Sequence, residues 1–190
     1  MLHSSQGRLP EPPEATVGPV DLAARVDDAL AVQALAFGLS EDEIGIRRHV
    51  MLRHAALRHT RALGVTTPEG RLVGFVYGMP NDRTQWWSTV VHPYLREDGV
   101  DHWLSGSFVI TELHVHPRWQ QLGLGRRLIT GITDTATEER SLLSAIDTDS
   151  PARRLYHHLG YRDLARRVIF PGAASPYAVM GAQLPLAGPR

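Results

Sequence analysis

The chain contains no cysteine among its 190 residues. It can therefore form no disulfide bond, bind no metal through thiolates and carry no acyl group on a cysteine as a covalent intermediate. If the protein transfers an acyl group, direct transfer from donor to acceptor is the simpler route.

An excess of charge of either sign is also missing, because 20 Lys and Arg residues balance 20 Asp and Glu residues. Proteins that bind nucleic acids are commonly basic, so we expect no nucleic-acid partner. No apolar stretch approaches the roughly 20 residues that span a bilayer, and the first residues lack the apolar segment of a secretory signal. These absences predict a cytoplasmic protein with no membrane partner.

A single domain with a substantial core is expected, because 43% of the 190 residues are hydrophobic. Prolines among polar residues predict a flexible tail at 1–16, which leaves 17–190 as the domain.

The hydrophobic pattern predicts two helices, two strands, an insertion at 80–106, and then strand, helix, strand, helix and two strands. This order is typical of an α/β fold whose mixed, mostly antiparallel central sheet is flanked by helices.

Local signals mark the first helices and the first hairpin. Asp21 can cap the first helix, and Ser40 with Glu43 forms a capping-box pattern that opens the second. The alternation of the strand at 71–79 is expected to place three side chains on one face: Val73, Phe75 and Tyr77.

Residues 107–131 combine a strand, a glycine-containing loop and a helix start. The segment 108–115 is apolar and β-branched, and Pro117 ends it because proline has no N–H for the sheet. Gly123 and Gly125 lead into a helix whose free N–H groups and dipole favour an anion. The pattern predicts a ligand with phosphate groups, most simply a pyrophosphate. The alternative is a helix start that merely needs a flexible backbone.

Two motifs of the chain resemble those of the GNAT (Gcn5-related N-acetyltransferase) superfamily. The first is the acyl-CoA-binding motif Gln/Arg-x-x-Gly-x-Gly/Ala after a strand ending in Val-x-Pro, which 120–125 and 115–117 match. The second is Asn-x-x-Ala-x-x-Leu-Tyr followed by Leu-Gly-Phe/Tyr, which 149–156 and 159–161 match, except that Asp149 replaces the asparagine.

The resemblance implies a GNAT fold that uses acetyl-CoA as the acyl donor. The pyrophosphate of CoA would bind backbone amides of the glycine loop, and the pantetheine arm would pair with the preceding strand like an extra strand. The donor contacts implied in this way are Leu113, His114, Val115, Gln120, Gln121, Leu122, Gly123, Leu124, Gly125, Arg126, Asp149, Arg153 and Tyr156. No metal ion is expected.

Three residues are the candidate catalytic groups. The resemblance implies that Tyr156 protonates the departing thiolate, and the alternative is a core tyrosine on an amphipathic helix. Glu112 is expected to act as general base on the amine, directly or through water, or else to be a structural carboxylate that pairs with an arginine. His114 is the alternative base, because histidine titrates near neutral pH.

A catalytic metal is a further interpretation of the same strand, because Glu112, His114 and His116 share one face if the strand alternates regularly. The CoA motif that follows argues against it, since that motif puts the donor beside this strand.

The acceptor is expected to be a primary amine of a small molecule or peptide. Trp86 and Trp87, in the insertion at 80–106, are expected either to wall the acceptor pocket or to form a satellite cluster or a homodimer contact. Phe37, near the connection of the first two helices, is a further candidate for acceptor contact. The sequence favours an enzyme over a silent acyl-CoA-binding sensor or interaction module, because such a module needs neither Glu112 nor Tyr156.

Overall fold

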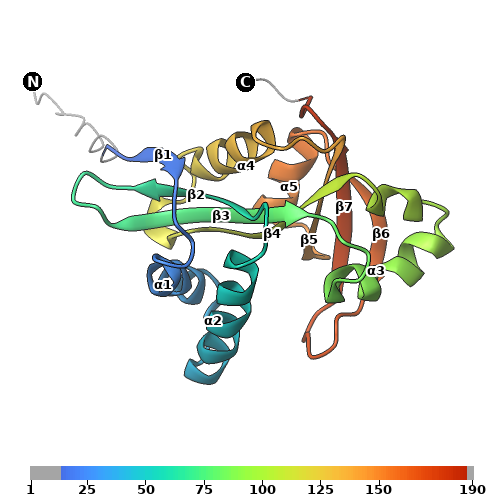
Figure 1. Ribbon diagram of the computed structural model, residues 1–190, viewed down its shortest axis with the longest axis horizontal. Coiled ribbons are helices and arrows are strands. Elements are labelled where there is room, and N and C mark those ends of the chain that lie inside the picture. Colours follow the sequence, from blue (N-terminus) through green and yellow to red (C-terminus); the bar gives the residue numbers. More distant parts are fainter. Residues whose placement is uncertain (1–13, 188–190) are drawn as a thin grey trace, which may run out of the picture.

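The computed structural model describes residues 14–187 and shows one central sheet with helices on both faces (Figure 1). The seven strands run in the order β1-β2-β3-β4-β5-β7-β6, and every neighbouring pair is antiparallel except β4 with β5. The predicted mixed, mostly antiparallel sheet is thus confirmed. The strands are β1 (Thr16–Pro19), β2 (Arg61–Thr66), β3 (Leu72–Pro80), β4 (Ser107–Val115), β5 (Arg140–Ile146), β6 (Arg162–Val168) and β7 (Tyr177–Gln183).

Most of the predicted tail, residues 1–13, lies outside the described residues. Thr16, at the end of that tail, already belongs to β1 and pairs with Thr66 of β2.

Two groups of helices cover the two faces of the sheet (Figure 1). One face carries α1, α2 and α3, and the other carries α4 and α5. The α-helices are α1 (Val26–Phe37), α2 (Glu41–Ala55), α3 (Trp86–Glu97), α4 (Leu124–Asp134) and α5 (Pro151–His158), and the short 3-10 helices are η1 (Asp101–Leu104) and η2 (Pro117–Trp119). Within residues 14–187, none of these helices has the length and apolar character needed to cross a membrane.

One of the two predicted helix caps is present, and the other side chain caps a turn. The Ser40 hydroxyl accepts from the Glu43 N–H, and the Glu43 carboxylate accepts from the Ser40 N–H at 2.9 Å, so the capping box at α2 is confirmed. The Asp21 carboxylate caps a turn instead, because it accepts from Ala23 and Ala24. Helix α1 therefore begins later than predicted, at Val26.

Two irregularities in the strands decide which side chains face α1 and α2. Between β2 and β3 the pairing passes from Gly74 to Leu72, so Val73 is bulged and packs in the α4 cluster, which corrects its predicted face. Phe75 and Tyr77 do share a face, against α1 and α2. A second register shift, between β3 and β4, passes over Thr111.

The sheet opens between its two parallel strands. Strand β4 pairs with β3 as far as Val115, but it pairs with β5 only over residues 107–109. Residues 110–115 of β4 therefore have no strand partner on the β5 side within the described chain. This edge offers backbone N–H and C=O groups to a ligand.

Candidate active site

The start of α4 has the properties of an anion-binding site. Gly123 occupies the N-cap position with φ 74°, and no side chain caps the helix. Gln121 also has a positive φ, of 64°. The position of a Cβ on Gly123 has no atom within 4 Å, so the backbone is open to an incoming group. The first N–H groups of α4 have no intrahelical acceptors and carry the positive end of the dipole.

Side chains next to this helix start add to the same property. Arg126, in the first turn, has a buried Nη1 without a hydrogen-bond partner in the described part of the chain. Gln120 Nε2 donates to the Val115 carbonyl at 3.0 Å and so ties the loop to the end of β4. Together with the unpaired edge of β4, these features fit a pantetheine arm that ends in phosphates.

Glu112 and His114 form a hydrogen-bonded pair on β4. Glu112 Oε2 lies 2.7 Å from His114 Nε2, and the other carboxylate oxygen lies 3.6 Å from Arg47 Nη1 on α2. The His114 ring is buried between two phenyl rings, with Phe37 edge-on at 5.2 Å and Phe75 at 5.5 Å. Two of the predicted catalytic residues and the predicted acceptor contact Phe37 thus lie together.

A second pair lies beside the first and was not predicted from the sequence. Tyr77 stands opposite Glu112 in the neighbouring strand, and its hydroxyl lies 3.1 Å from His54 Nδ1 on α2. Burial, and after it the charge of Glu112, raises the pKa of Tyr77. Burial lowers the pKa of His54, and the charge of Glu112 opposes this effect. The available signal was the spacing of Arg47 and His54, seven residues apart on one helix face.

Tyr156 lies on α5, buried in the cluster between the sheet and α4. Burial raises the pKa of Tyr156 to about 12, and the charge of Glu112 acts in the same direction. No side-chain hydrogen bond within residues 14–187 involves the Tyr156 hydroxyl, which therefore remains available as a donor.

Asp149 and Arg153, the other predicted donor contacts near α5, already have protein partners. Asp149 is exposed and pairs with Arg154 at 2.7 Å. Arg153 is buried and its guanidinium reaches Asp163 at 2.6 Å and Asp147 at 3.3 Å. Contact of either side chain with CoA stays a prediction, and the geometry around Arg153 favours a structural role.

The tryptophans of the insertion lie against the other half of the sheet. Trp87 Nε1 donates to Ser144 Oγ of β5 at 2.9 Å, and the Trp86 ring packs at 5.8 Å from Phe170. Trp87 belongs to a cluster formed by α3, β5, β6 and β7. The contacts of Trp87 correspond to the predicted satellite cluster, whereas Trp86 is 60% exposed. Contact of either ring with the acceptor or with a second copy stays a prediction.

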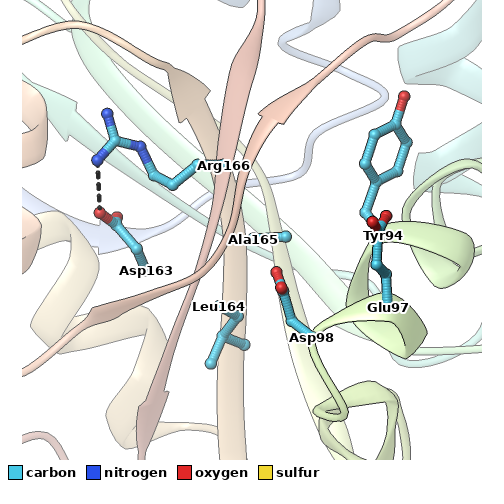
Figure 2. Close-up of a pocket in the computed structure, with 7 residues that line it drawn as sticks. All are labelled: Tyr94, Glu97, Asp98, Asp163, Leu164, Ala165 and Arg166. Atoms are coloured by element: carbon cyan, nitrogen blue, oxygen red, sulfur yellow. Dashed lines mark hydrogen bonds and ion pairs between the residues drawn. The ribbon is translucent and has the colours of Figure 1, made fainter.

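Two further features lie apart from these side chains, the ring of His116 and a hollow on the surface. His116 Nδ1 accepts from the Arg118 N–H at 3.1 Å, and within residues 14–187 no three His, Asp or Glu side chains are grouped as metal ligands. A hollow of about 440 Å³ lies between α3 and β6 (Figure 2), and its walls include none of the predicted site residues. Figure 2 shows Arg166 paired with Asp163 at its edge; the other lining residues are Tyr94, Glu97, Asp98, Leu164 and Ala165.

Comparison with known proteins agrees with this geometry. A family model described as "Acetyltransferase (GNAT) domain" matches residues 59–163, which is more than half of the chain. The "GCN5-like protein acetyltransferase Rv2170" of Mycobacterium tuberculosis (strain ATCC 25618 / H37Rv) is 30% identical over 197 residues, covering 88% of this chain and 96% of that protein.

Solved structures share the fold at lower identity. The ribosomal-protein-S18-alanine N-acetyltransferase from Escherichia coli matches with a TM-score of 0.66 and 15% identity, over 92% of this chain and 97% of that chain. The PaiA N-acetyltransferase from Thermoplasma acidophilum, solved with coenzyme A, matches with a TM-score of 0.59 and 12% identity, over 90% of this chain and 99% of that chain. The predicted GNAT resemblance is thus confirmed, and the chain belongs to the GNAT family of acetyltransferases.

Proposed function

We propose that this acetyltransferase moves an acetyl group directly from acetyl-CoA to a primary amine of a small molecule or peptide. The observation that supports this most is the open start of α4 next to the unpaired edge of β4, with the hydrogen-bonded pair Glu112 and His114 on the same strand. The M. tuberculosis relative is named a protein acetyltransferase, which favours an amine carried by a protein or peptide.

The donor would lie along β4 and end at α4. In this proposal, the backbone N–H groups at the start of α4 and the unpartnered Nη1 of Arg126 bind the pyrophosphate. The pantetheine arm pairs with Leu113 and Val115 on the unpaired edge of β4. This arrangement brings the thioester towards Glu112, His114 and Tyr156.

The chemistry then needs a proton acceptor and a proton donor. The amine nitrogen attacks the thioester carbonyl, a C–N bond forms and the C–S bond breaks. The amine proton goes to the Glu112–His114 pair, in which the carboxylate accepts from Nε2–H and leaves the Nδ1 lone pair of the neutral ring free. Tyr156 gives its proton to the departing thiolate, and its pKa of about 12 keeps the hydroxyl protonated until that step.

Substitution of Tyr156 tests the proton donor. We expect Tyr156→Phe to lower kcat by about 10-fold or more, with the Kd of acetyl-CoA nearly unchanged, because the hydroxyl acts on the leaving group rather than on binding. Tyr161→Phe is the matched control, since it removes a buried hydroxyl from the same cluster, where it donates to Ser141. Equal turnover of the Tyr156 and Tyr161 variants would contradict the assignment.

The pair on β4 is tested by a double-mutant cycle. We expect Glu112→Gln and His114→Gln each to lower kcat. The kcat of the double variant should be little lower than that of the less active single variant, because the two groups act as one unit. Acetyl-CoA affinity, measured by calorimetry, should persist in all three. Binding of acetyl-CoA without turnover of any amine by the unmodified protein would instead indicate a silent acyl-CoA-binding module.

A further inference from the structure

Arg47 is the cation next to Glu112, and its hydrogen-bonding capacity is largely unused. It projects from α2 with 37% of its side chain exposed, and its Nη1 lies 3.6 Å from Glu112 Oε1. That distance is too long for a hydrogen bond, and Glu112 already binds His114 through the other oxygen at 2.7 Å. The next residue, Arg48, is by contrast bound to Asp27 at 2.8 Å.

The surroundings of Arg47 define what could bind there. Arg47 faces Glu112 of β4, which binds His114 and stands opposite Tyr77. The exposed ring of Phe37 packs against His114. On α2 itself, Glu43 lies one turn before Arg47. Both nearby carboxylates already have partners, since Glu112 binds His114 and Glu43 accepts from the N–H and hydroxyl of Ser40. A polycationic acceptor would therefore meet two carboxylates that are already bound, and it would be repelled by Arg47.

An acceptor with a negative group beside its amine fits this arrangement better. A carboxylate can accept two parallel hydrogen bonds from one guanidinium, and a guanidinium that is only loosely paired loses little by turning to it. Release of Arg47 from Glu112 also frees that carboxylate oxygen towards the incoming amine. The two ends of the acceptor would then bind groups that are already neighbours, which requires the amine and the carboxylate to be close in the acceptor.

We propose that the acceptor is a primary amine with a carboxylate close to it, and that Arg47 binds this carboxylate. The proposal rests on the proposed acetyltransferase reaction at Glu112 and His114. The carboxylate can come from a peptide whose first residue is acidic or from the α-carboxylate of a free amino acid.

Matched acceptors separate these sources. Initial rates with acetyl-CoA, followed through the released thiol, are compared for Asp-Ala-Ala amide against Asn-Ala-Ala amide, and for alanine against alaninamide. We expect kcat/KM to favour the carboxylate-bearing member of at least one pair by 10-fold or more. A preference in the first pair identifies the acidic peptide, and one in the second pair identifies the amino acid.

Variants of α2 assign the preference to Arg47. We expect Arg47→Gln to abolish it by raising KM at least 10-fold for the carboxylate-bearing acceptor, with a smaller change in kcat, and Arg47→Lys to retain part of it. Arg48→Gln is the control on the same helix and should change neither constant. An unchanged preference in Arg47→Gln would overturn the assignment.

The outcome also separates this inference from the function on which it rests. Turnover by the unmodified protein without preference in either pair would overturn the inference and leave the acetyltransferase reaction standing. Acetyl-CoA binding without turnover of any acceptor would overturn both.

Discussion

The helices α4 and α5 both follow strands that line the opening of the sheet, yet their first turns differ. At α4, Gly123 stands in the N-cap position with φ 74° and no side chain satisfies the first N–H groups. At α5, the Ser150 hydroxyl accepts from the Arg153 N–H at 3.2 Å and Pro151 occupies the first turn, where no N–H is needed.

The side chains of the two first turns continue this difference. Arg126 of α4 keeps its terminal guanidinium nitrogen Nη1 without a partner among the described residues, whereas in Arg153 it is Nε that has none there. Arg153 of α5 is surrounded by Asp147 and Asp163, and Arg166 contacts both of these carboxylates, at 2.6 and 3.4 Å. The comparison teaches that the first helix start is open for a ligand, whereas the second is closed and stabilises the fold.

The largest effect is expected where the closed helix start is opened. Arg153→Leu would leave the buried Asp147 and the partly buried Asp163 with fewer cationic partners, and we expect the free energy of unfolding to fall by about 3–5 kcal/mol. The measurement is chemical denaturation. Arg154→Leu is the control, because Arg154 is half exposed and its pair with Asp149 should contribute at most about 0.5 kcal/mol.

The acetyl-CoA affinity of folded Arg153→Leu sharpens the comparison. We expect it to stay within about threefold of the unmodified protein, because the guanidinium is occupied by carboxylates. A loss of affinity much larger than this, at unchanged stability, would place Arg153 on the donor as the family resemblance implied.

The second effect is expected where the open helix start is blocked. Gly123→Val should weaken acetyl-CoA binding by about 100-fold, because a branched side chain would occupy the space that the phosphates approach. Gly99→Val is the matched control for backbone strain, since Gly99 has φ 68° and also has open space around it. Calorimetry that finds the same affinity in both variants would contradict the placement of the pyrophosphate.

The smallest effect is expected at Asp149, between the two helices in sequence. Asp149→Asn restores the residue that is usual in the family motif, but the carboxylate is 84% exposed and pairs only with Arg154. We expect the Kd of acetyl-CoA to change by less than about threefold, because solvent screens an exposed charge. A change of 10-fold or more, measured in the same calorimeter, would show that Asp149 contacts the donor.

Much of the fold could be predicted because its signals are local. The strand at 107–115, the glycine loop, the capping box of Ser40 and the cap of Ser150 each depend on residues that are close in sequence. The Asp21 signal was local as well, but it fitted a turn as well as a helix, and the turn formed. The bulge at Val73 could not be predicted, because it depends on the register with β2.

The candidate site divides in the same way. The motifs by themselves identified the family, and they led to the predictions of Glu112 and His114 on the strand before the glycine loop and of Tyr156 in the second motif. Arg47 and Glu112 are 65 residues apart in the sequence (112 − 47), and His54 and Tyr77 are 23 residues apart (77 − 54). Only the tertiary structure brought each pair together. The same holds for Arg153, which pairs with two carboxylates from other parts of the chain only once the fold is formed. The physical reason is that caps, turns and periodic faces depend on neighbours along the chain, whereas ion pairs and hydrogen bonds between packed elements depend on how the helices and the sheet come together.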